Sequence, residues 1–95
     1  SEVINVSGLK VVPCEVEEAI TTLAGVVEVK VYAGEHRSGT QIVKAAVAVE
    51  NGLTAADIRA HCEQLLVYYK RPQVVTLVDA LPRTPTGKIH REQLP

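Results

Sequence analysis

One stretch of the chain, residues 81–89, combines a constrained backbone with a charge suited to chemistry on an anion. Two prolines restrict this stretch, Gly87 permits a tight turn, and Lys88 is its last polar residue. A lysine ammonium is a compact cation on a flexible stem, so it can neutralise a phosphate or carboxylate oxygen that gains charge during a reaction. We therefore predict that residues 81–89, the Lys88 loop, direct Lys88 at an anion. The alternative is a proline turn that ends in a solvated lysine.

The Lys88 loop does not match the phosphate-binding loop of P-loop nucleoside triphosphatases. That pattern needs a glycine five residues before its Gly-Lys pair and a Ser or Thr directly after it. Pro82 and Ile89 occupy these positions, so the Walker pattern is excluded.

The length and composition of the chain limit its possible functions. Ninety-five residues are enough for one domain that buries roughly 60–65% of its unfolded surface, which leaves no room for a large substrate pocket. Three Tyr and no Phe or Trp argue against binding nucleic acid by base stacking. Nothing resembles a signal peptide, and no apolar run approaches the roughly 18 residues of a membrane helix, so we expect a cytoplasmic protein without membrane contact.

Charge is unevenly distributed along the chain, although the net charge is only −1. Residues 1–58 carry four basic and eight acidic side chains, whereas residues 59–95 carry six basic and three acidic ones. The C-terminal part is therefore expected to attract anions, unless these charges are simply solvated.

The cysteines and histidines show no spacing typical of a metal site. Cys14 and Cys62 fall within helical patterns, which predicts reduced thiols and neither a disulfide nor a metal centre. His36 is expected in a polar turn. His61 lies off the apolar stripe of its helix, so we expect it on the surface.

Apolar periodicity predicts two helices. The first begins near Pro13, which suits the first turn of a helix, and ends at Gly25. The second begins after Thr54, with Asp57 three positions on, and ends before Pro72. The side chains expected to face the core are Val16, Ala19, Ile20 and Leu23 in the first helix and Ile58, Cys62, Leu65 and Leu66 in the second.

Three strands and a ribbon complete the expected fold. Residues 27–31 alternate valine with charge, as in a half-buried strand, residues 42–49 should form a more central strand, and residues 74–78 a third. A polar hairpin loop is expected at residues 34–39 and a last helical turn at residues 91–94. The order ββαββαβ predicts an α+β domain: a small three-stranded sheet with two to three packed helices and an N-terminal two-stranded ribbon.

Two motifs, about seventy residues apart, carry a resemblance to a known family. Residues 7–17 read Ser-Gly-x-x-Val-x-Pro-x-Glu-Val-Glu, and residues 82–89 read Pro-x-Thr-Pro-x-Gly-Lys-Ile. Together with Tyr-Lys-Arg-Pro at residues 69–72 and the strand at residues 74–79, they make the whole chain, residues 1–95, resemble the small C-terminal domain of adenylate-forming enzymes. This family includes acyl-CoA synthetases, peptide-synthetase adenylation domains and luciferases.

The resemblance implies the chemistry of the Lys88 loop. Adenylate-forming enzymes join a carboxylic acid to ATP, release pyrophosphate and then pass the acyl group from AMP to a thiol, while the small domain moves between two poses over a large N-terminal domain. In the first pose Lys88 would be the catalytic residue and would contact ATP and AMP. Pro82, Thr86 and Gly87 would support its loop. The resemblance implies ATP and CoA as cofactors, with Mg²⁺ bound alongside ATP by the N-terminal domain.

The resemblance assigns a second site to the N-terminal hairpin. In the second pose Ser7 and Gly8 would line the tunnel for the pantetheine thiol, and Lys10 would lie near the phosphates of the nucleotide or thioester. The alternative for Gly8 is a bare hairpin turn. The hinge position of the family, commonly Asp or Lys, falls on Ser1 and so departs from the pattern.

The acceptor and the parent protein are inferred by likeness. Residues 4–8 and 13–17 look more like acyl-CoA synthetases than peptide synthetases, so CoA is the first choice of acceptor and a carrier protein the second. The N-terminal ATP-binding and acid-binding domain lies outside the 95 residues, so the chain alone is predicted to be inactive. It could also be a stand-alone module that completes a truncated synthetase in trans.

A regulatory role also follows from the resemblance. Residues 82–88 match the Pro-x-x-x-x-Gly-Lys pattern around the lysine that protein acetyltransferases modify in acyl-CoA synthetases, so Lys88 is a candidate acetylation site. Nothing in the sequence specifies which carboxylic acid is activated.

Overall fold

Three strands form the sheet on which the rest of the chain packs. The computed structural model describes residues 2–95, and in it β3 (Val26–Glu35), β4 (Gln41–Val49) and β5 (Val74–Val78) form a sheet in the order β3-β4-β5. β3 and β4 are antiparallel, whereas β4 and β5 are parallel. The predicted central position of residues 42–49 is confirmed.

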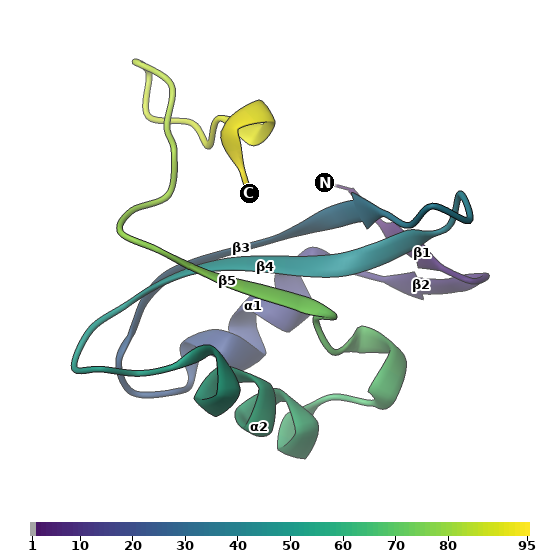
Figure 1. Cartoon of the computed structure of the whole chain (residues 1–95), viewed down its shortest axis with the longest axis horizontal. Coiled ribbons are helices and arrows are strands. Elements are labelled where there is room, and N and C mark those ends of the chain that lie inside the picture. Colours follow the sequence, from purple (N-terminus) through teal and green to yellow (C-terminus); the bar gives the residue numbers. More distant parts are fainter. Residues whose placement is uncertain (1) are drawn as a thin grey trace.

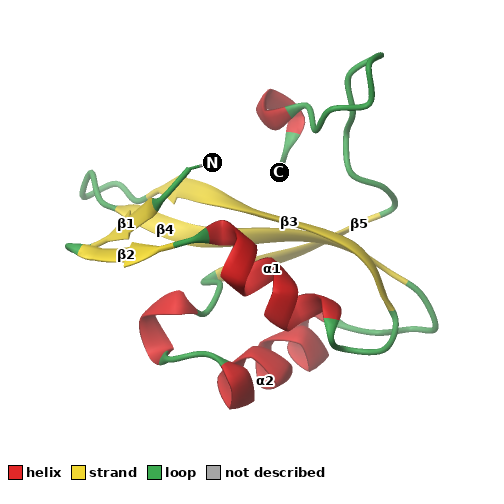
Figure 2. Cartoon of the chain, turned by 180° about the vertical axis from the view of Figure 1, so that it is seen from behind, coloured by secondary structure: helices red, strands yellow, loops and turns green. Residues whose placement is uncertain are grey.

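Both α-helices cover one face of this sheet (Figure 1, Figure 2). α1 (Pro13–Thr21) begins with a proline in its first turn, and α2 (Ala55–Leu65) begins with a capping box in which the side chains of Thr54 and Asp57 each accept from the other's backbone amide. The apolar sides of the helices meet the sheet in the main core. Its buried members are Ile4, Val11, Val16, Ile20, Val31, Val43, Ala45, Val47, Ile58, Cys62, Leu66 and Val75.

The predicted N-terminal ribbon consists of β1 (Ile4–Val6) and β2 (Leu9–Val11), which pair antiparallel. Each ribbon strand contributes one fully buried side chain to the main core. The amide of Asn5 also donates to Gln41 Oε1 at 2.7 Å, which ties the ribbon to the start of β4. The α+β fold class, with its separate ribbon and three-stranded sheet, is confirmed.

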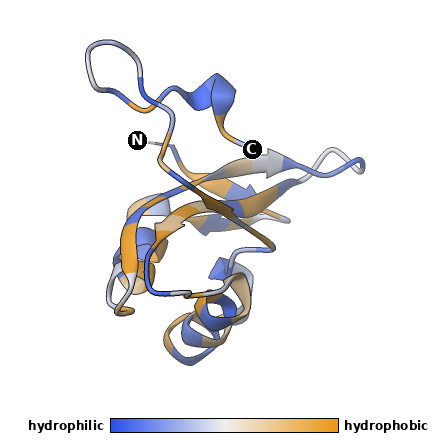
Figure 3. Cartoon of the chain, turned by 60° about the vertical axis from the view of Figure 1, so that its left-hand side comes forward, coloured by the Kyte–Doolittle hydropathy of each residue, from blue (hydrophilic) through white to orange (hydrophobic). Residues whose placement is uncertain are grey.

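The segment after β5, residues 79–95, crosses the opposite face of the sheet and is called the strap (Figure 1). Near its start Leu81 is buried with Tyr32 and Ala46 in a second, smaller apolar cluster, against which Val78, Ile89 and Leu94 pack. In Figure 3 the hydrophobic colour is concentrated in the sheet, whereas the outer part of the strap is mostly hydrophilic. The strap is therefore attached to the sheet by a few apolar side chains.

The far end of the strap is held by hydrogen bonds. After η2 (Arg91–Gln93), a short 3₁₀ turn, Tyr32 Oη and Lys44 Nζ donate to the carbonyl oxygen of Pro95 at 2.6 and 2.8 Å. Lys44 Nζ also lies 5.4 Å from the centre of the Tyr32 ring. Both ends of the strap are thus fixed to the sheet, and the Lys88 loop lies between them.

Two expectations about the strands are wrong. β3 continues to Glu35, so residues 34 and 35 belong to the strand and not to the hairpin loop. Val27 is 59% exposed because a β-bulge between Val26 and Glu28 inserts one extra residue into β3. The bulge breaks the alternation that the pattern assumed, and Val26 packs against the main core instead.

Two expectations about the helices also need correction. α1 ends at Thr21 and not at Gly25, because the next two amides, of Thr22 and Leu23, donate to carbonyls three residues back, as in a tightened last turn. Leu65 is 52% exposed, whereas Leu66, which has extended backbone angles, is buried.

His61 joins the two helices and is not the surface residue that its position off the stripe suggested. Its Nε2 lies 2.7 Å from the hydroxyl of Thr22 and 3.2 Å from the carbonyl oxygen of Ala19, both at the end of α1. The ring is partly buried as a result.

The side chain of Arg71 closes the end of α2 and generates a stability prediction. Its Nε donates to the carbonyl oxygen of Leu66 at 2.9 Å and its Nη2 to that of Glu63 at 3.1 Å, where helical carbonyls otherwise lack partners. Arg71→Ala should therefore lower the free energy of unfolding by about 1–2 kcal/mol in urea denaturation. Arg59→Ala, on the exposed side of α2, is the control and should change it by less than about 0.5 kcal/mol. Equal effects of the two variants would show that the cap contributes nothing.

Candidate functional site

The Lys88 loop is a small hairpin built from backbone hydrogen bonds. Arg83 and Ile89 form an isolated antiparallel bridge, the amide of Thr84 donates to the carbonyl of Lys88 at 2.7 Å, and the amide of Gly87 donates back to Thr84 at 2.9 Å. Gly87 has a φ of 92°, a conformation that side chains of L-residues rarely adopt. The predicted loop is therefore an ordered turn at that glycine.

Pro82 and Thr86, the other two residues predicted to support the loop, act at different places. The carbonyl of Pro82 accepts from the amide of His90 at 2.8 Å, which closes the base of the hairpin. The hydroxyl of Thr86 lies 3.0 Å from that of Thr84, whose oxygen in turn lies 3.3 Å from the amide of Lys88. Pro82 thus belongs to the base of the loop and Thr86 to its exposed tip.

The side chain of Lys88 is exposed, and within residues 2–95 it takes part in no ion pair. Its backbone is fixed by the hairpin, while the residue itself is exposed to solvent. A cation held in this way is available to an anion brought by another molecule or domain.

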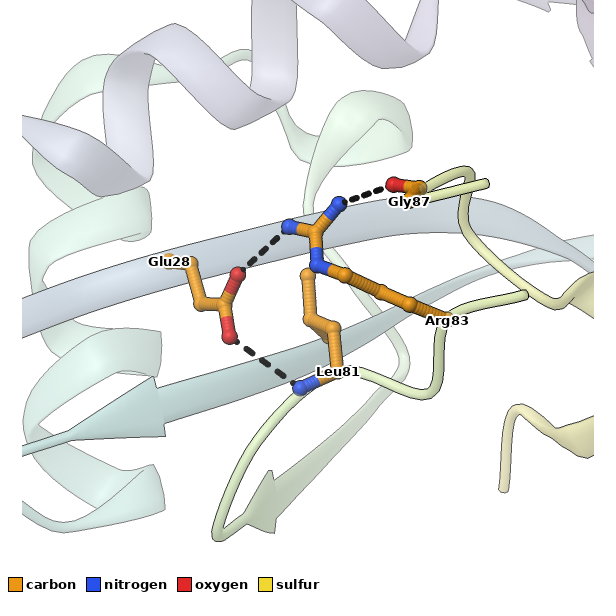
Figure 4. Close-up of polar contacts among 4 residues, drawn as sticks. All are labelled: Glu28, Leu81, Arg83 and Gly87. Carbon is orange, nitrogen blue, oxygen red and sulfur yellow. Dashed lines mark hydrogen bonds and ion pairs between the residues drawn. The ribbon is translucent and has the colours of Figure 1, made fainter. Parts of the chain in front are cut away.

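A carboxylate on the sheet braces the base of the Lys88 loop (Figure 4). Glu28, on β3, accepts from the amide of Leu81 through Oε2 at 3.1 Å and from Nη2 of Arg83 through Oε1 at 2.8 Å. Nη1 of Arg83 donates to the carbonyl oxygen of Gly87 at 2.9 Å. We refer to these four residues as the Glu28 clasp.

The environment of Glu28 keeps it ionised. The hydrogen bond from the Leu81 amide, followed by that from the Arg83 guanidinium, holds the pKa of its carboxyl below the ordinary value of 4.5. The negative charge of Glu28 is thus present across the neutral pH range.

The second predicted site is the turn between β1 and β2. Ser7 and Gly8 have φ angles of 51° and 90°, the two positive values of a type I′ hairpin turn, and the amide of Gly8 donates to Asn5 Oδ1 at 2.7 Å. A Cβ added at Gly8 would meet nothing within 4 Å in the described chain. The positive φ thus explains why a glycine stands at this position, and the space beside it is open.

A shallow groove of about 450 Å³ lies between this turn and the β3–β4 hairpin. It is lined by Asn5, Ser7, Gly8, Glu35, Gly39, Thr40 and Gln41. Lys10, the third residue predicted at this end, is exposed on β2 opposite Asn5. The structure therefore gathers Ser7, Gly8 and Lys10 on one hairpin.

The two predicted sites lie at opposite ends of the domain. Figure 1 and Figure 2 show the ribbon at one end of the sheet and the Lys88 loop above the other end. The domain extends over 36 × 34 × 22 Å, so the structure does not bring Lys88 together with Ser7, Gly8 or Lys10. Each site can act only when its own face meets a ligand or partner.

Sequence reasoning missed Glu28 and the role of Arg83. Their contact spans 55 positions, and only the position of Glu28 as a charged residue in a half-buried strand pointed to a partner. Ser1, the predicted hinge position, lies outside the described residues. Cys14 and Cys62 are free cysteines in the described residues. Over residues 2–95, no three His, Cys, Asp or Glu side chains are grouped to hold a metal ion, and no helix is long and apolar enough to cross a membrane.

Comparisons with known proteins identify relatives over the whole chain. The family model described as "AMP-binding enzyme C-terminal domain" matches residues 15–88. The chain is 45% identical over 93 residues to a 3,4-dihydroxybenzoate–[aryl-carrier protein] ligase of Bacillus anthracis, covering 98% of this chain and 22% of that protein. It is 37% identical over 98 residues to a benzoate–CoA ligase of Thauera aromatica, covering 98% of this chain and 19% of the relative.

A solved structure also contains a domain similar to this chain. The fatty acyl CoA synthetase of Mycobacterium tuberculosis superposes with a TM-score of 0.85 and 34% identity, covering 95% of this chain and 18% of that one. The chain thus spans about a fifth of the length of these relatives.

The Glu28 clasp predicts a pH-dependent contribution to stability. A carboxyl whose pKa is lowered on folding stabilises the folded state above its ordinary pKa, and this contribution is lost as the pH falls through the folded value. Glu28→Gln should therefore lower the free energy of unfolding at pH 7 by about 1 kcal/mol. In chemical denaturation across the pH range, the difference from wild type should shrink below pH 4.5. A difference that is constant with pH would contradict the assignment.

Proposed function

The chain belongs to the family of AMP-binding enzyme C-terminal domains, and from this premise we propose that it is the small domain of an ATP-dependent acid–thiol ligase of the acyl-CoA synthetase type. In this proposal Lys88 supplies the catalytic cation for adenylation of a carboxylic acid. The observation that carries it is the exposed side chain of Lys88, which has no ion-pair partner within the described residues and lies on a hairpin braced against the sheet.

The electrostatics of adenylation explain why a cation is needed. A carboxylate attacks the α-phosphate of ATP, so two negative groups must approach each other. At about 4 Å and an effective dielectric near 20, one contact between an ammonium and a unit negative charge is on the order of 4 kcal/mol. If that contact forms only in the transition state, it corresponds to roughly a thousandfold in rate. Lys88 would act as an electrostatic catalyst and not as a base.

The remaining parts of the reaction would come from a larger partner domain. The chain spans about a fifth of its relatives, and the groove at the ribbon is too open to enclose a nucleotide. The N-terminal domain of the same enzyme would bind ATP with its Mg²⁺ and the acid, and the small domain alone would be inactive. A module that supplies Lys88 in trans to a truncated synthetase fits the same geometry.

Thiol transfer would use the opposite end of the domain. There Ser7 and Gly8 would line the path of the pantetheine arm, and Lys10 would lie near its phosphates or those of the nucleotide. The separation of this turn from the Lys88 loop supports a reaction in two poses, because one pose cannot present both ends to one active site.

The acceptor thiol has two candidates. CoA is supported by the benzoate–CoA ligase and the fatty acyl CoA synthetase among the relatives. A carrier protein is the second candidate, and the relative at 45% identity favours it, because its name specifies an aryl-carrier protein. The same chain could then belong to an adenylation domain that loads a carrier.

Lys88 is also a candidate for regulation by a protein acetyltransferase. Its side chain is exposed on an ordered hairpin, which makes the ammonium accessible to a modifying enzyme. Acetylation would leave an amide without charge and would therefore remove the interaction on which the proposed adenylation depends.

The role of Lys88 predicts a split between the two half-reactions. In the full-length ligase, Lys88→Ala should reduce acid-dependent ATP–pyrophosphate exchange by roughly a thousandfold, because the cation is lost from the transition state. Thioester formation from supplied acyl-adenylate should be retained. Lys30→Ala, which removes another partly exposed lysine, is the control and should keep both activities. Near-normal exchange in the Lys88 variant would refute the assignment.

The role of Gly8 predicts the opposite split. Gly8→Leu should leave pyrophosphate exchange intact and block acyl transfer from supplied acyl-adenylate, because the side chain would enter the open space beside the turn. Gly52 is a matched control: its φ is 74° and a Cβ there also meets nothing within 4 Å. Gly52→Leu should carry a similar backbone strain but keep transfer.

The same assay identifies the acceptor. Transfer is measured to CoA and to a phosphopantetheinylated carrier protein, and the acceptor with the higher kcat/KM is assigned. Equal loss of both half-reactions in the Gly8 variant would point to a purely structural glycine.

A further inference from the structure

The Glu28 clasp connects the sheet to the residue directly before Lys88. One oxygen of Glu28 holds the amide of Leu81 at the start of the Lys88 loop, and the other holds one branch of the Arg83 guanidinium. The second branch of Arg83 holds the carbonyl of Gly87. Because that carbonyl belongs to the peptide group that joins Gly87 to Lys88, the clasp restrains the backbone from which the lysine side chain extends (Figure 4).

Gly87 is the position where such a restraint matters. It lacks a side chain, its φ is 92°, and a Cβ added there would meet nothing within 4 Å in the described residues 2–95. Glycine also has more accessible backbone conformations than any other residue. Without Arg83, the Gly87–Lys88 peptide group would be held mainly by hydrogen bonds within the exposed hairpin.

We propose that Glu28 and Arg83 are positioning residues that set the pose of Lys88 for adenylate formation, an inference that rests on the function proposed above. Arg83 is suited to this role because its planar guanidinium group donates to two acceptors in fixed directions. Glu28 is suited because its β3 backbone is paired in the sheet, while its side chain is only 29% exposed. Catalysis by a positioned charge depends on geometry, and a misplacement of about 1 Å can cost orders of magnitude in rate.

A positioning role differs from a purely structural role in what it affects. The clasp touches the loop but not the β1–β2 turn, so its loss should slow adenylation without slowing thiol transfer. Because Glu28 and Arg83 act through Lys88, their removal should have no further effect once the lysine is absent. A simple loss of fold stability would slow both half-reactions in every background.

The test uses the full-length ligase with the neutral variants Glu28→Gln and Arg83→Gln. Each should lower the kcat of acid-dependent ATP–pyrophosphate exchange by about tenfold, while the KM for ATP and the rate of thioester formation stay within about twofold. In a Lys88→Ala background, Glu28→Gln should cause no additional loss. Unchanged exchange, equal loss of both half-reactions or further loss in the double variant would each overturn the proposal.

A matched control removes an ion pair that holds the strap outside the Lys88 loop. Glu2→Gln removes the ion pair between Glu2 and Arg91, which contacts the strap but not the Lys88 loop, and should leave exchange unchanged. If Glu2→Gln lowers exchange as much as Glu28→Gln does, the effect is one of strap stability and the proposal fails.

A second measurement does not depend on the proposed function. Deuterium uptake by a peptide covering residues 80–90 should be faster in Glu28→Gln than in wild type or Glu2→Gln, because the Leu81 amide and the loop lose their restraint. Unchanged uptake would overturn the clasp itself. Normal ATP–pyrophosphate exchange in Lys88→Ala, together with faster deuterium uptake in Glu28→Gln, would refute the function of Lys88 and, with it, the positioning role.

Discussion

The burial of β4 on both faces is the constraint on which the rest of the domain depends. Val43, Ala45 and Val47 point to the helices, whereas Ala46 points to the strap, and all four side chains are almost completely buried. A strand of this kind cannot be exposed on either side, so α1 and α2 must cover one face and the strap the other. The strap therefore belongs to the fold even though much of it is polar. The Lys88 loop is carried by a segment that the sheet needs for burial.

The strap has anchored ends and an exposed tip. Its apolar residue Leu81 and its terminal carbonyl at Pro95 are attached to the sheet, while the tip at Lys88 contacts solvent. The Glu28 clasp joins these two parts, because it uses a side chain of the sheet to restrain the backbone beside the tip. The side chain of an exposed lysine can therefore extend from a restrained backbone.

Local patterns predicted most of the elements, and long-range contacts account for what they missed. Pro13, the Thr54–Asp57 capping box and the apolar run of β4 act within a few residues, so the sequence reveals them directly. The exposure of Val27 depends on a bulge defined by pairing with β4, and the partial burial of His61 depends on its contacts with the end of α1. The position of Lys88 in an exposed loop could be predicted from its own motif. Its support by Glu28 could not, because nothing in the spacing relates β3 to the strap.

The contrast between residues 8 and 88 bears on how such domains diverge during evolution. At Gly8 a positive φ is imposed by the hairpin, so selection for folding alone would preserve the glycine in a lineage that had lost every catalytic step. Lys88 contributes its backbone to the hairpin, but within residues 2–95 its side chain makes no hydrogen bond or ion pair, so drift at this position would carry little folding cost. Under the role proposed for Lys88, the identity of residue 88 among descendants of such a domain would record whether adenylation is still under selection, whereas the identity of residue 8 would not.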